Sequence, residues 1–408
     1  MHSEILIIGA GASGLFCALQ AAWTGHRVLL LEHEKTPAQK LNITGKGRCN
    51  VTNNCDVQTV IANIPRNASF LYSALNRFTP QDTIDFFESL GIELKTERGN
   101  RVFPKSDNAH DISGALINAA KQAGVKIRHA DVKRLIIENG KVKGVVCEKE
   151  SVFADSVVIA TGGLSYPKTG STGDGYKFAR QAGHTVTELG GSLVGVRLYG
   201  SECAEAMGLS LKNCGLKLCD NESEKIIYSE QGEMLFTHYG MSGPLILSAS
   251  THMTDIYKGK YTFIINLKPA LDDKKLDERI LRDFSEAKNR DFSNSLGRLL
   301  PKAVIPIVIR RSGIAPETKV NQITKQQRET LVSVIHNLEF EVKELCDVSE
   351  AIVTRGGVSV KEISPSSMQS KLVDGLYFIG EVLDVDGYTG GFNLQIAFST
   401  AYACAQSL

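Results

Sequence analysis

A glycine-rich turn near the N-terminus constrains the fold of this chain more than any other feature. The apolar run Glu4–Ile8 leads directly into residues 9–14, which read GAGASG, and the helix-forming stretch Leu15–Thr24 follows. A second apolar run, Val28–Leu31, then ends at Glu32. A short strand, a GxGxxG turn, a helix and a second strand ending in an acid together predict a βαβ unit of the dinucleotide-binding kind.

Each glycine of this turn has its own physical task. We expect Gly9 to permit the tight turn, Gly11 to let the backbone approach a pyrophosphate, and Gly14 to allow close packing of helix on strand. The helix N-terminus offers unpaired N–H groups and a partial positive charge to that anion. Glu32 is placed to accept hydrogen bonds from an adenosine ribose, and its charge would repel a 2′-phosphate.

An ADP half is common to FAD and NAD, so later segments must decide between them. The loop Lys40–Asn53 is polar and reads KLNITGKGRCNVTN. We expect it to wrap the far side of a dinucleotide, with Arg48 or Lys40 neutralising phosphate; the alternative is a solvated basic loop. The buried strand Ala154–Gly163 ends in small residues. Ligands of open α/β sheets bind at such carboxyl ends, so this strand is expected to pass beneath the cofactor.

The C-terminal stretch Gly375–Ser399 is the third deciding segment. Its strand Leu376–Ile379 is followed by Gly380 and Glu381, and a carboxylate at a strand end is suited to hold ribityl hydroxyls. The helix that opens at Thr389–Gln395 is expected to face the N1/O2 edge of a flavin and to stabilise the charge of the reduced ring. A C-terminus that returns to the first βαβ unit favours a long, buried FAD over NAD.

Composition narrows the class of protein further. A chain of 408 residues predicts two or three domains. The 46 basic and 45 acidic residues give a net charge of +1, which lacks the footprint of a nucleic-acid or membrane-surface partner. No apolar run reaches membrane-span length, and a signal peptide is not expected. Nine scattered cysteines without a CxxC pair predict reduced thiols in the cytoplasm, and no metal site is expected.

Six motifs spread over the chain carry a family resemblance. They read GAGASG, KLNITGKGRCNVTN, VVIATGGLSYPKTGSTGDGY, GEMLFTHYGMSGP, VTRGGV and GEVLDVDGYTGGFNLQIAFSTAYA. Together they resemble the BaiN/YhiN-like flavoproteins, NAD(P)/FAD-dependent oxidoreductases that include bile-acid reductases and aminoacetone oxidases. The resemblance implies an α/β fold: a Rossmann-like FAD-binding domain with an inserted small β-barrel and helical segment. A more distant similarity, through TGDG and the C-terminal Gly-Glu, is to fumarate-reductase-type flavoproteins.

The same resemblance implies where a non-covalent FAD is contacted. The matching positions lie in the N-terminal turn, the basic loop, the strand end near residue 161 and the C-terminal helix, and one backbone contact reaches the adenine from Val132. The implied cofactor-binding residues are Gly9, Gly11, Ala12, Ser13, Gly14, Glu32, Lys40, Gly47, Arg48, Cys49, Asn50, Val132, Thr161, Gly162, Asp174, Gly380, Glu381, Gly391, Phe392, Asn393 and Leu394.

The order of the predicted strands and helices also indicates an insertion. We predict an FAD-binding domain in two parts, residues 1–191 and 351–408. The insertion at 192–350 is predicted to hold a barrel over about 192–270 and helices over about 271–340. The expected elements are helices at Pro80–Leu90 and Ser113–Ala123, strands within Lys126–Cys147 and at Leu209–Cys219, Lys225–Tyr228 and Tyr261–Leu267, and helices at Lys274–Asn289, Leu296–Arg310 and Lys325–Leu338.

The sequence leaves the catalytic acid or base unassigned. His238, in FTHYG, is the best candidate for a proton donor, although a structural histidine in a turn is the plainer reading. Tyr166 is suited to the flavin face or to packing. Cys49 is either a thiolate with a lowered pKa or a small polar filler, and the filler is the plainer account. Asp384 and Asp386 are ligands or solvated loop acids.

Three classes of function follow from these motifs. The leading one is an FAD-dependent oxidoreductase that passes hydride or electrons between NAD(P)H or an organic substrate and an enone-like acceptor or oxygen. A second GxGxxG is missing, so NAD(P)H as donor is expected to bind transiently. The alternative class is a flavin-dependent RNA-modifying protein, and the third is a sensor without turnover. A small-molecule substrate is the expected partner, and the oligomeric state stays open.

Overall fold

Both ends of the chain contribute to one seven-stranded sheet in the computed structural model, which describes residues 2–408. The strand order is β6-β2-β1-β9-β8-β7, and β18 pairs with β9 beside this path. Strands β6, β2, β1, β9 and β18 run parallel to one another, whereas β8 pairs antiparallel with both β9 and β7. The strands are β1 (His2–Ile8), β2 (Val28–Glu32), β6 (Lys126–His129), β7 (Val132–Glu138), β8 (Lys141–Cys147), β9 (Ser151–Ile159) and β18 (Leu376–Phe378).

Strand β9 is the centre of this arrangement because it pairs with three other strands. One edge follows β1, with Ile8 opposite Ile159. Its other edge pairs first with β8, as Gly144 opposite Phe153, and then with β18, as Phe378 opposite Ile159. The carboxyl ends of β1, β9 and β18 therefore meet at one place, although they are separated by hundreds of residues in sequence.

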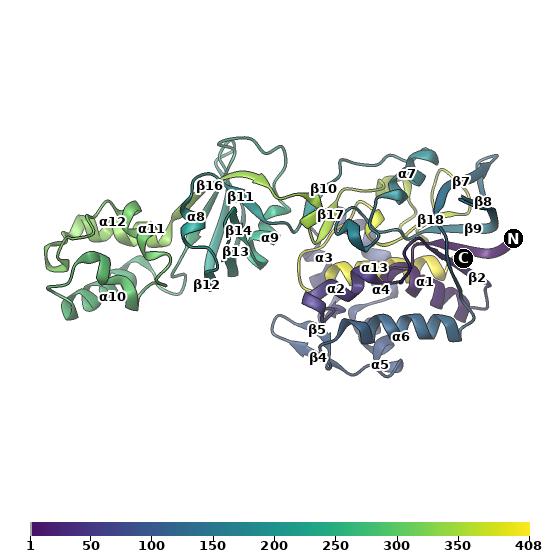
Figure 1. Ribbon diagram of the computed structural model, residues 1–408, viewed down its shortest axis with the longest axis horizontal. Coiled ribbons are helices and arrows are strands. Elements are labelled where there is room, and N and C mark those ends of the chain that lie inside the picture. Colours follow the sequence, from purple (N-terminus) through teal and green to yellow (C-terminus); the bar gives the residue numbers. More distant parts are fainter. Residues whose placement is uncertain (1) are drawn as a thin grey trace. The chain divides into compact units, whose positions relative to one another are not determined.

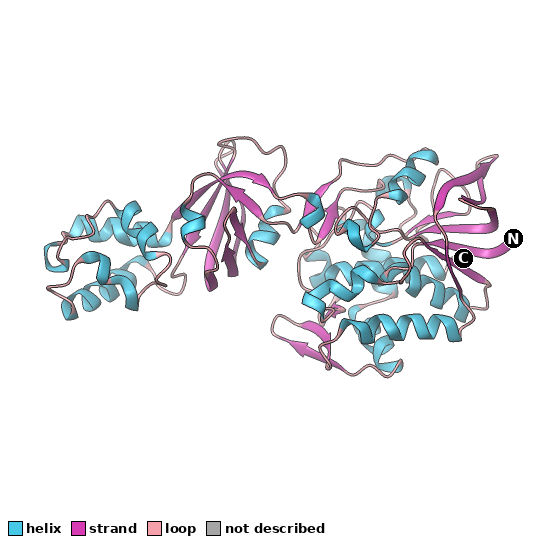
Figure 2. Ribbon diagram, in the orientation of Figure 1, coloured by secondary structure: helices cyan, strands magenta, loops and turns pink. Residues whose placement is uncertain are grey.

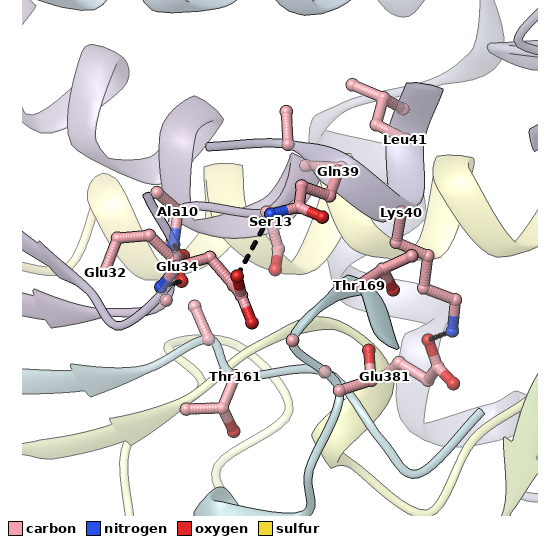
Figure 3. A pocket seen from close by; sticks show the side chains of 18 of the residues that line it. Ala10, Ser13, Glu32, Glu34, Gln39, Lys40, Leu41, Thr161, Thr169 and Glu381 are labelled. Carbon is pink, nitrogen blue, oxygen red and sulfur yellow. Dashed lines mark hydrogen bonds and ion pairs between the residues drawn. The ribbon is translucent and has the colours of Figure 1, made fainter. Parts of the chain in front are cut away.

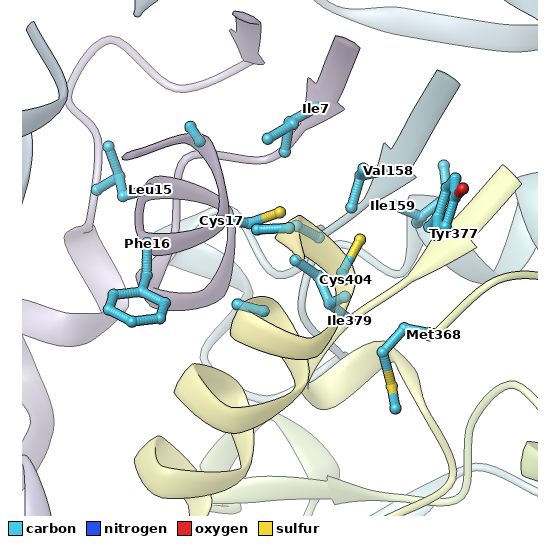
Figure 4. Close-up of a cluster of buried hydrophobic side chains, with 14 of the residues drawn as sticks. Ile7, Leu15, Phe16, Cys17, Val158, Ile159, Met368, Tyr377, Ile379 and Cys404 are labelled. Atoms are coloured by element: carbon cyan, nitrogen blue, oxygen red, sulfur yellow. The ribbon is translucent and has the colours of Figure 1, made fainter. Parts of the chain in front are cut away.

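Two helices from opposite ends of the chain, α1 (Ala12–Trp23) and α13 (Phe392–Ala405), pack against each other below these strand ends. Figure 4 shows Cys17 of α1 and Cys404 of α13 among side chains of the sheet, including Ile7 and Ile159. The Phe16 ring lies 5.3 Å from the ring of Phe398 and is completely buried. Burial of this aromatic and aliphatic surface holds the C-terminal helix to the first βαβ unit.

A buried amide fixes the position of α13 further. Gln395 is fully buried, and its Oε1 accepts hydrogen bonds from the hydroxyls of Thr52 at 2.6 Å and Thr83 at 2.8 Å. Its Nε2 donates to the carbonyl of Phe78 at 3.1 Å and to the hydroxyl of Ser399. A buried polar group whose donors and acceptors are all used specifies one arrangement of the elements that it joins.

Unit 1, which comprises Met1–Ser192 and Val348–Leu408, contains this sheet and its covering helices. In Figure 1 its two stretches of chain carry the purple-to-teal and yellow ends of the colour scale. Besides α1 and α13, its helices are α2 (Gln39–Gly47), α3 (Val57–Ala62), α4 (Tyr72–Arg77), α5 (Pro80–Ser89), α6 (Ala109–Gln122) and α7 (Asp174–Gln181). Its smaller sheets pair β3 (Thr52–Asn53), β5 (Arg101–Pro104) and β4 (Leu94–Glu97), and β10 (Gly190–Ser192) with β17 (Val353–Arg355).

The prediction of a loop over Lys40–Asn53 needs a correction, because α2 occupies its first half. The helix is interrupted at Thr44, and Gly45 and Lys46 then adopt positive φ angles of 58° and 60°. A non-glycine residue in this region is uncommon, so the segment ends its helix with a tight reversal before Asn50. The sequence did not indicate this short helix, because the segment is polar and contains glycines.

Unit 2, Leu193–Asp347, contains a closed barrel of six strands in the order β11-β14-β13-β12-β15-β16. Phe236, Phe263 and Met241 are fully buried in its core. Figure 2 shows these strands together with the helices of the same unit. The elements are β11 (Val196–Leu198), α8 (Glu202–Glu205), β12 (Ser210–Asp220), β13 (Lys225–Phe236), β14 (Gly240–Ser242), α9 (Pro244–Ser250), β15 (Tyr261–Asn266), α10 (Asp273–Glu286), α11 (Ile305–Ser312), α12 (Lys325–His336) and β16 (Leu338–Leu345).

A Rossmann-like α/β sheet together with a barrel confirms the predicted fold class. One predicted helix, Leu296–Arg310, is wrong in its extent. A 3₁₀ turn at Leu296–Arg298 is followed by a break, and α11 begins only at Ile305. Pro301 explains the break, because proline removes a backbone donor and clashes with the preceding turn of a helix. Within residues 2–408, no helix has the length and apolar character that spanning a bilayer requires.

A buried histidine joins α7 to the segment before β18. His184 Nδ1 lies 3.0 Å from a carboxylate oxygen of Glu362, and its Nε2 lies 2.7 Å from the hydroxyl of Ser370. Burial lowers the pKa of His184 below its ordinary value of 6.5, and the nearby Glu362 offsets only part of this effect. The imidazole is therefore neutral in the folded protein at neutral pH.

This geometry predicts that the protein loses stability as the pH falls below 6.5. Below this pH the unfolded chain binds a proton at His184 that the folded chain does not bind. The free energy of unfolding therefore falls by up to about 1.4 kcal/mol for each pH unit, until the pH reaches the pKa of His184 in the folded protein. Melting temperatures measured from pH 7.5 to 5 should fall more steeply for the wild type than for His184→Gln. The exposed His110→Gln serves as a control with the wild-type slope. Parallel wild-type and His184→Gln curves would contradict the assignment.

Candidate functional site

A cavity lies at the carboxyl ends of β1, β2 and β9, entirely within unit 1. It encloses about 1320 Å³ of space, including the part that is open to solvent. The turn after β1, the end of β2, helix α2, the segment after β9 and the start of α13 all supply lining residues. Ligands of open α/β sheets bind at this place, so the cavity is the candidate site.

The turn between β1 and α1 has the backbone geometry that the glycine motif predicts. Gly9 has a φ of 100°, and a Cβ added there would lie 2.6 Å from the carbonyl oxygen of Ala160. A Cβ on Gly14 would lie 1.9 Å from the carbonyl oxygen of Gly9. Gly11, in contrast, has nothing within 4 Å of such a position and lines the cavity. Two glycines thus permit close packing, and the third leaves room for a ligand.

The first turn of α1 faces the cavity without a side-chain cap. Gly11 occupies the N-cap position and no side chain accepts a hydrogen bond from the first N–H groups of the helix. Ala12 and Ser13 of this turn line the cavity. Uncapped N–H groups and the positive end of the helix dipole are suited to bind a phosphate anion.

Glu32 ties the end of β2 to the glycine turn. Its Oε2 accepts a hydrogen bond from the backbone N–H of Ala10 at 2.6 Å, and its Oε1 accepts one from the backbone N–H of Glu34 at 2.8 Å. Each carboxylate oxygen has a second lone pair, and Glu32 also lines the cavity. The carboxylate is thus held in place and keeps the capacity to accept hydrogen bonds from a ribose diol.

An ion pair links the two ends of the chain across the cavity wall. Lys40 Nζ on α2 lies 2.7 Å from Glu381 Oε2, and Figure 3 shows the two side chains meeting. Lys40 also donates to the hydroxyl of Ser165 at 2.6 Å. Glu381 Oε1 accepts from that hydroxyl at 3.0 Å and from the backbone N–H of Thr354 at 2.9 Å. Four segments of unit 1 therefore meet at one carboxylate.

Two buried polar atoms in the cavity wall have no hydrogen-bond partner within the described residues. They are Thr161 Oγ1 and His33 Nε2, and both residues line the cavity. Both atoms are inaccessible to solvent, and His33 Nε2 lies 3.7 Å from Glu34 Oε1, so neither atom is exposed to the cavity. The open space above Gly11 and the uncapped start of α1 fit a long, polar nucleotide cofactor such as FAD.

The structure brings most of the predicted contact residues to this cavity. Asp174 is among them; burial alone would raise its pKa, but hydrogen bonds from Lys177 and Thr172 lower it, so the carboxylate is charged. The predicted residues that line the cavity are Gly9, Gly11, Ala12, Ser13, Glu32, Lys40, Val132, Thr161, Gly162, Asp174, Glu381, Asn393 and Leu394.

The GRCN segment, residues 47–50, does not line the cavity. Arg48 forms ion pairs with Glu97 at 2.9 Å and Asp107 at 3.1 Å, so its charge is already neutralised by protein groups. Cys49 is fully buried, and burial raises the pKa of its thiol to about 12. The thiol is therefore protonated, which contradicts a reactive thiolate and agrees with the filler role.

Four other predicted residues lie behind the cavity wall and pack the strands and helices there. A Cβ on Gly391 would lie 2.3 Å from the carbonyl oxygen of Thr52, and one on Gly380 would lie 2.7 Å from the hydroxyl of Ser13. Gly14 is in close contact with Gly9, as described above, and Phe392 is buried. These positions shape the wall through close approach of the backbone.

The candidates for chemistry beyond the cofactor are dispersed. His238 is exposed in the turn between β13 and β14 of unit 2, where its ring lies 5.0 Å from that of Tyr239. Asp386 is buried and accepts two hydrogen bonds from Arg66 and one from Ser192, so it has a structural role. Tyr166 begins a 3₁₀ turn with a φ of 54° and does not line the cavity. A proton-donor role for His238 stays a prediction.

Sequence reasoning missed several residues of the cavity wall. His33 and Glu34 directly follow the ribose acid, and Gln39 precedes Lys40, so adjacency in sequence was the available signal. Val353 is the first residue of the motif VTRGGV, and Ile352 precedes it. The pairing of β17 with β10 brings both residues into unit 1. No periodicity in the sequence points to that pairing.

Comparisons with known proteins agree with this geometry. The chain is 33% identical over 99% of its length to a protein named ribosomal RNA dihydrouridine synthase from Escherichia coli, covering 98% of that protein. It is 29% identical over 99% of its length to a 3-dehydro-bile acid delta(4,6)-reductase from Clostridium scindens, again covering 98% of it. The 3-ketosteroid delta1-dehydrogenase structure from Sterolibacterium denitrificans shares the fold, with a TM-score of 0.50, 14% identity and 99% coverage of both chains.

A Rossmann-like sheet with a dinucleotide cavity at its carboxyl ends, and full-length similarity to these enzymes, define a flavoprotein oxidoreductase. The family model described as HI0933-like protein Rossmann domain matches residues 3–407. The chain therefore belongs to the HI0933-like family of FAD-binding Rossmann proteins.

The contacts of Glu32 predict that Glu32→Ala weakens FAD binding by about 10- to 100-fold, because hydrogen bonds to a charged group contribute about 1.5–3 kcal/mol. Titration of FAD into apoprotein, followed by flavin fluorescence, gives the dissociation constant. The matched control is Glu88→Ala, an exposed glutamate of α5 that should retain wild-type affinity. Equal FAD affinity in Glu32→Ala and the wild type would show that this carboxylate does not hold the ribose.

Proposed function

We propose that this protein is an FAD-dependent reductase that adds hydride across a carbon–carbon double bond conjugated to a carbonyl group, and that its substrate is a uridine of ribosomal RNA. The observation that carries the proposal is the 33% identity, over nearly the whole of both chains, to a ribosomal RNA dihydrouridine synthase. A second such protein, from Haemophilus influenzae, is 34% identical over 100% of this chain.

One type of reaction unites the names of the relatives. Dihydrouridine is uridine with two hydrogens added across C5=C6, a bond conjugated to the C4 carbonyl. The name of the Clostridium scindens protein likewise describes reduction of double bonds in a 3-oxo steroid. In both cases a hydride and a proton are added and the conjugated double bond is lost. This agrees with the enone-like acceptor that the sequence led us to expect.

The chain's own residues have defined parts in this proposal. The uncapped turn of α1 binds the diphosphate of FAD, and Glu32 binds the adenosine ribose. Lys40 and Glu381 would hold the ribityl chain, and Asn393 and Leu394 at the start of α13 would contact the flavin ring. Bound FAD supplies the hydride. The further proposed contacts are the remaining predicted residues of the cavity wall: Gly9, Gly11, Ala12, Ser13, Val132, Thr161, Gly162 and Asp174.

NADH or NADPH is the proposed electron donor, and it binds transiently because the chain has a single GxGxxG motif. Anaerobic stopped-flow mixing should therefore bleach the flavin absorbance of the holoprotein with one of the two nucleotides. Glu32 would repel a 2′-phosphate within the FAD cavity, but it does not select between the two donors. Bleaching by neither nucleotide, with bleaching by an amine or alcohol, would replace the reductase proposal with an oxidase.

Incubation with unmodified transcripts of bacterial ribosomal RNA tests the substrate. We expect dihydrouridine, detected by mass spectrometry of digested nucleosides as uridine plus two hydrogens, to form with holoprotein and reductant. The Glu32→Ala variant without added FAD should form at least tenfold less in the same time.

A 3-oxo-4-ene steroid provides the second arm of this experiment. The full-length similarity to the bile-acid reductase makes a small enone the second candidate substrate. Reduction of the steroid at rates far above those for RNA, with no dihydrouridine formed, would overturn the RNA proposal and support the small-molecule one.

A further inference from the structure

The near-zero net charge of the chain hides an uneven distribution. The helical segment of unit 2, defined as residues 273–336 from the start of α10 to the end of α12, holds 13 lysines and arginines and 8 acids, a net charge of +5. The rest of the chain then has 33 basic and 37 acidic residues, a net charge of −4. A whole-chain count therefore understates how basic one part of the surface is.

Residues 282–302 of this segment hold five of its 13 basic residues and have a net charge of +2. Three acids occur there, and each is in an ion pair: Asp283 with Arg279, Glu286 with Arg298, and Asp291 with Lys319. Arg282, Lys288, Arg290 and Lys302 are all exposed, and no ion pair or side-chain hydrogen bond engages them within the described residues. We call these four residues the basic tip.

Local geometry places Arg282, Lys288 and Arg290 at the C-terminal end of α10, and Lys302 follows the 3₁₀ turn that is tied to this end. Arg282 is four residues before Glu286 and so lies on the same side of the helix. The ion pair between Glu286 and Arg298 holds the 3₁₀ turn at Leu296–Arg298 against that helix end, four residues before Lys302. Lys288 and Arg290 lie in the turn that leaves α10, where the Arg290 N–H donates to the carbonyl of Ala287 at 2.8 Å. Figure 1 shows α10 beside α11 and α12 in this segment.

We propose that the basic tip is a docking surface for the phosphate backbone of RNA. The inference rests on the proposed function for its choice of RNA, but its evidence is the unpaired charge of the tip. Four exposed cations that form no ion pair within the described residues attract a polyanion, and release of its counterions drives binding. Lysine and arginine on separate turns match a chain of successive phosphates better than one compact anion.

The tip differs from a membrane-binding surface in its apolar content. Surface helices that bind lipid combine basic residues with a wide apolar face. Here the apolar side chains of α10, Leu276, Ile280 and Phe284, are buried in the unit 2 core, and Leu281 is the exposed exception. The segment therefore presents charge without a face to insert, which favours RNA over an anionic bilayer.

The test compares two variants of the holoprotein that each lose four positive charges. The tip variant is Arg282→Gln, Lys288→Gln, Arg290→Gln and Lys302→Gln. The matched control is Lys121→Gln, Lys126→Gln, Lys149→Gln and Arg180→Gln, four exposed cations of unit 1 that form no ion pair within the described residues. The probes are unmodified transcripts of bacterial ribosomal RNA. Their dissociation constants are measured from 50 to 300 mM KCl, and flavin content and melting temperature check the fold.

We expect the slope of log K against log[KCl] to become shallower by about 3 in the tip variant, because each lost phosphate contact removes about 0.7–0.9. The control variant should change by less than 1. The double variant Lys288→Gln with Lys302→Gln should give about half of the full effect. Equal slopes in the tip and control variants, or binding to phosphatidylglycerol vesicles but not to RNA, would overturn the proposal.

The outcomes separate this inference from the proposed function. A shallower slope in the tip variant, with no dihydrouridine formed by the wild type, would leave the docking surface standing and remove the proposed reaction. Dihydrouridine formation with equal slopes in both variants would keep the reaction and overturn the docking surface.

Discussion

The parallel pairing of β18 with β9 is the constraint on which the candidate site depends. It brings the strand end before Glu381 next to the strand ends before Gly9 and Thr161, so residues from both ends of the chain line one cavity. The same return of the chain packs α13 against α1 in a buried aromatic and aliphatic core. Without it, the N-terminal βαβ unit would offer only half of a binding site for a dinucleotide.

Charged groups in the wall of this cavity then make it suited to a dinucleotide. The uncapped start of α1 provides positive potential at the glycine turn, and Glu32 and Asp174 provide carboxylates in the cavity wall. The ion pair of Lys40 with Glu381 joins an N-terminal helix to the C-terminal segment through two charges that are about four-fifths buried. A partly buried pair needs further hydrogen bonds to offset the loss of water, and Ser165 and Thr354 supply them.

Sequence reasoning captured the features that follow from local chemistry. The glycine turn, the acid after β2 and the strand–acid–helix order near the C-terminus all depend on residues close in sequence. The Rossmann-like part of the fold followed from them, whereas the family resemblance implied the inserted barrel. The roles of Arg48 and Cys49 did not follow from local chemistry, because they are set by partners far away in the chain, such as Glu97, Asp107 and the core around Cys49. The wall residues Ile352 and Val353 reach the cavity through strand pairing, which their own sequence does not signal. Charge shows the same limit, since the net +1 of the chain conceals the basic helical segment.

The visible absorption spectrum of the purified protein, before and after addition of FAD, tests the central claim most directly. A single cavity lined by both chain ends predicts two flavin absorption bands with altered vibronic structure, and one FAD per chain released intact when the protein is denatured. A colourless protein that takes up no added FAD would contradict the account, because no other group is proposed to fill that cavity.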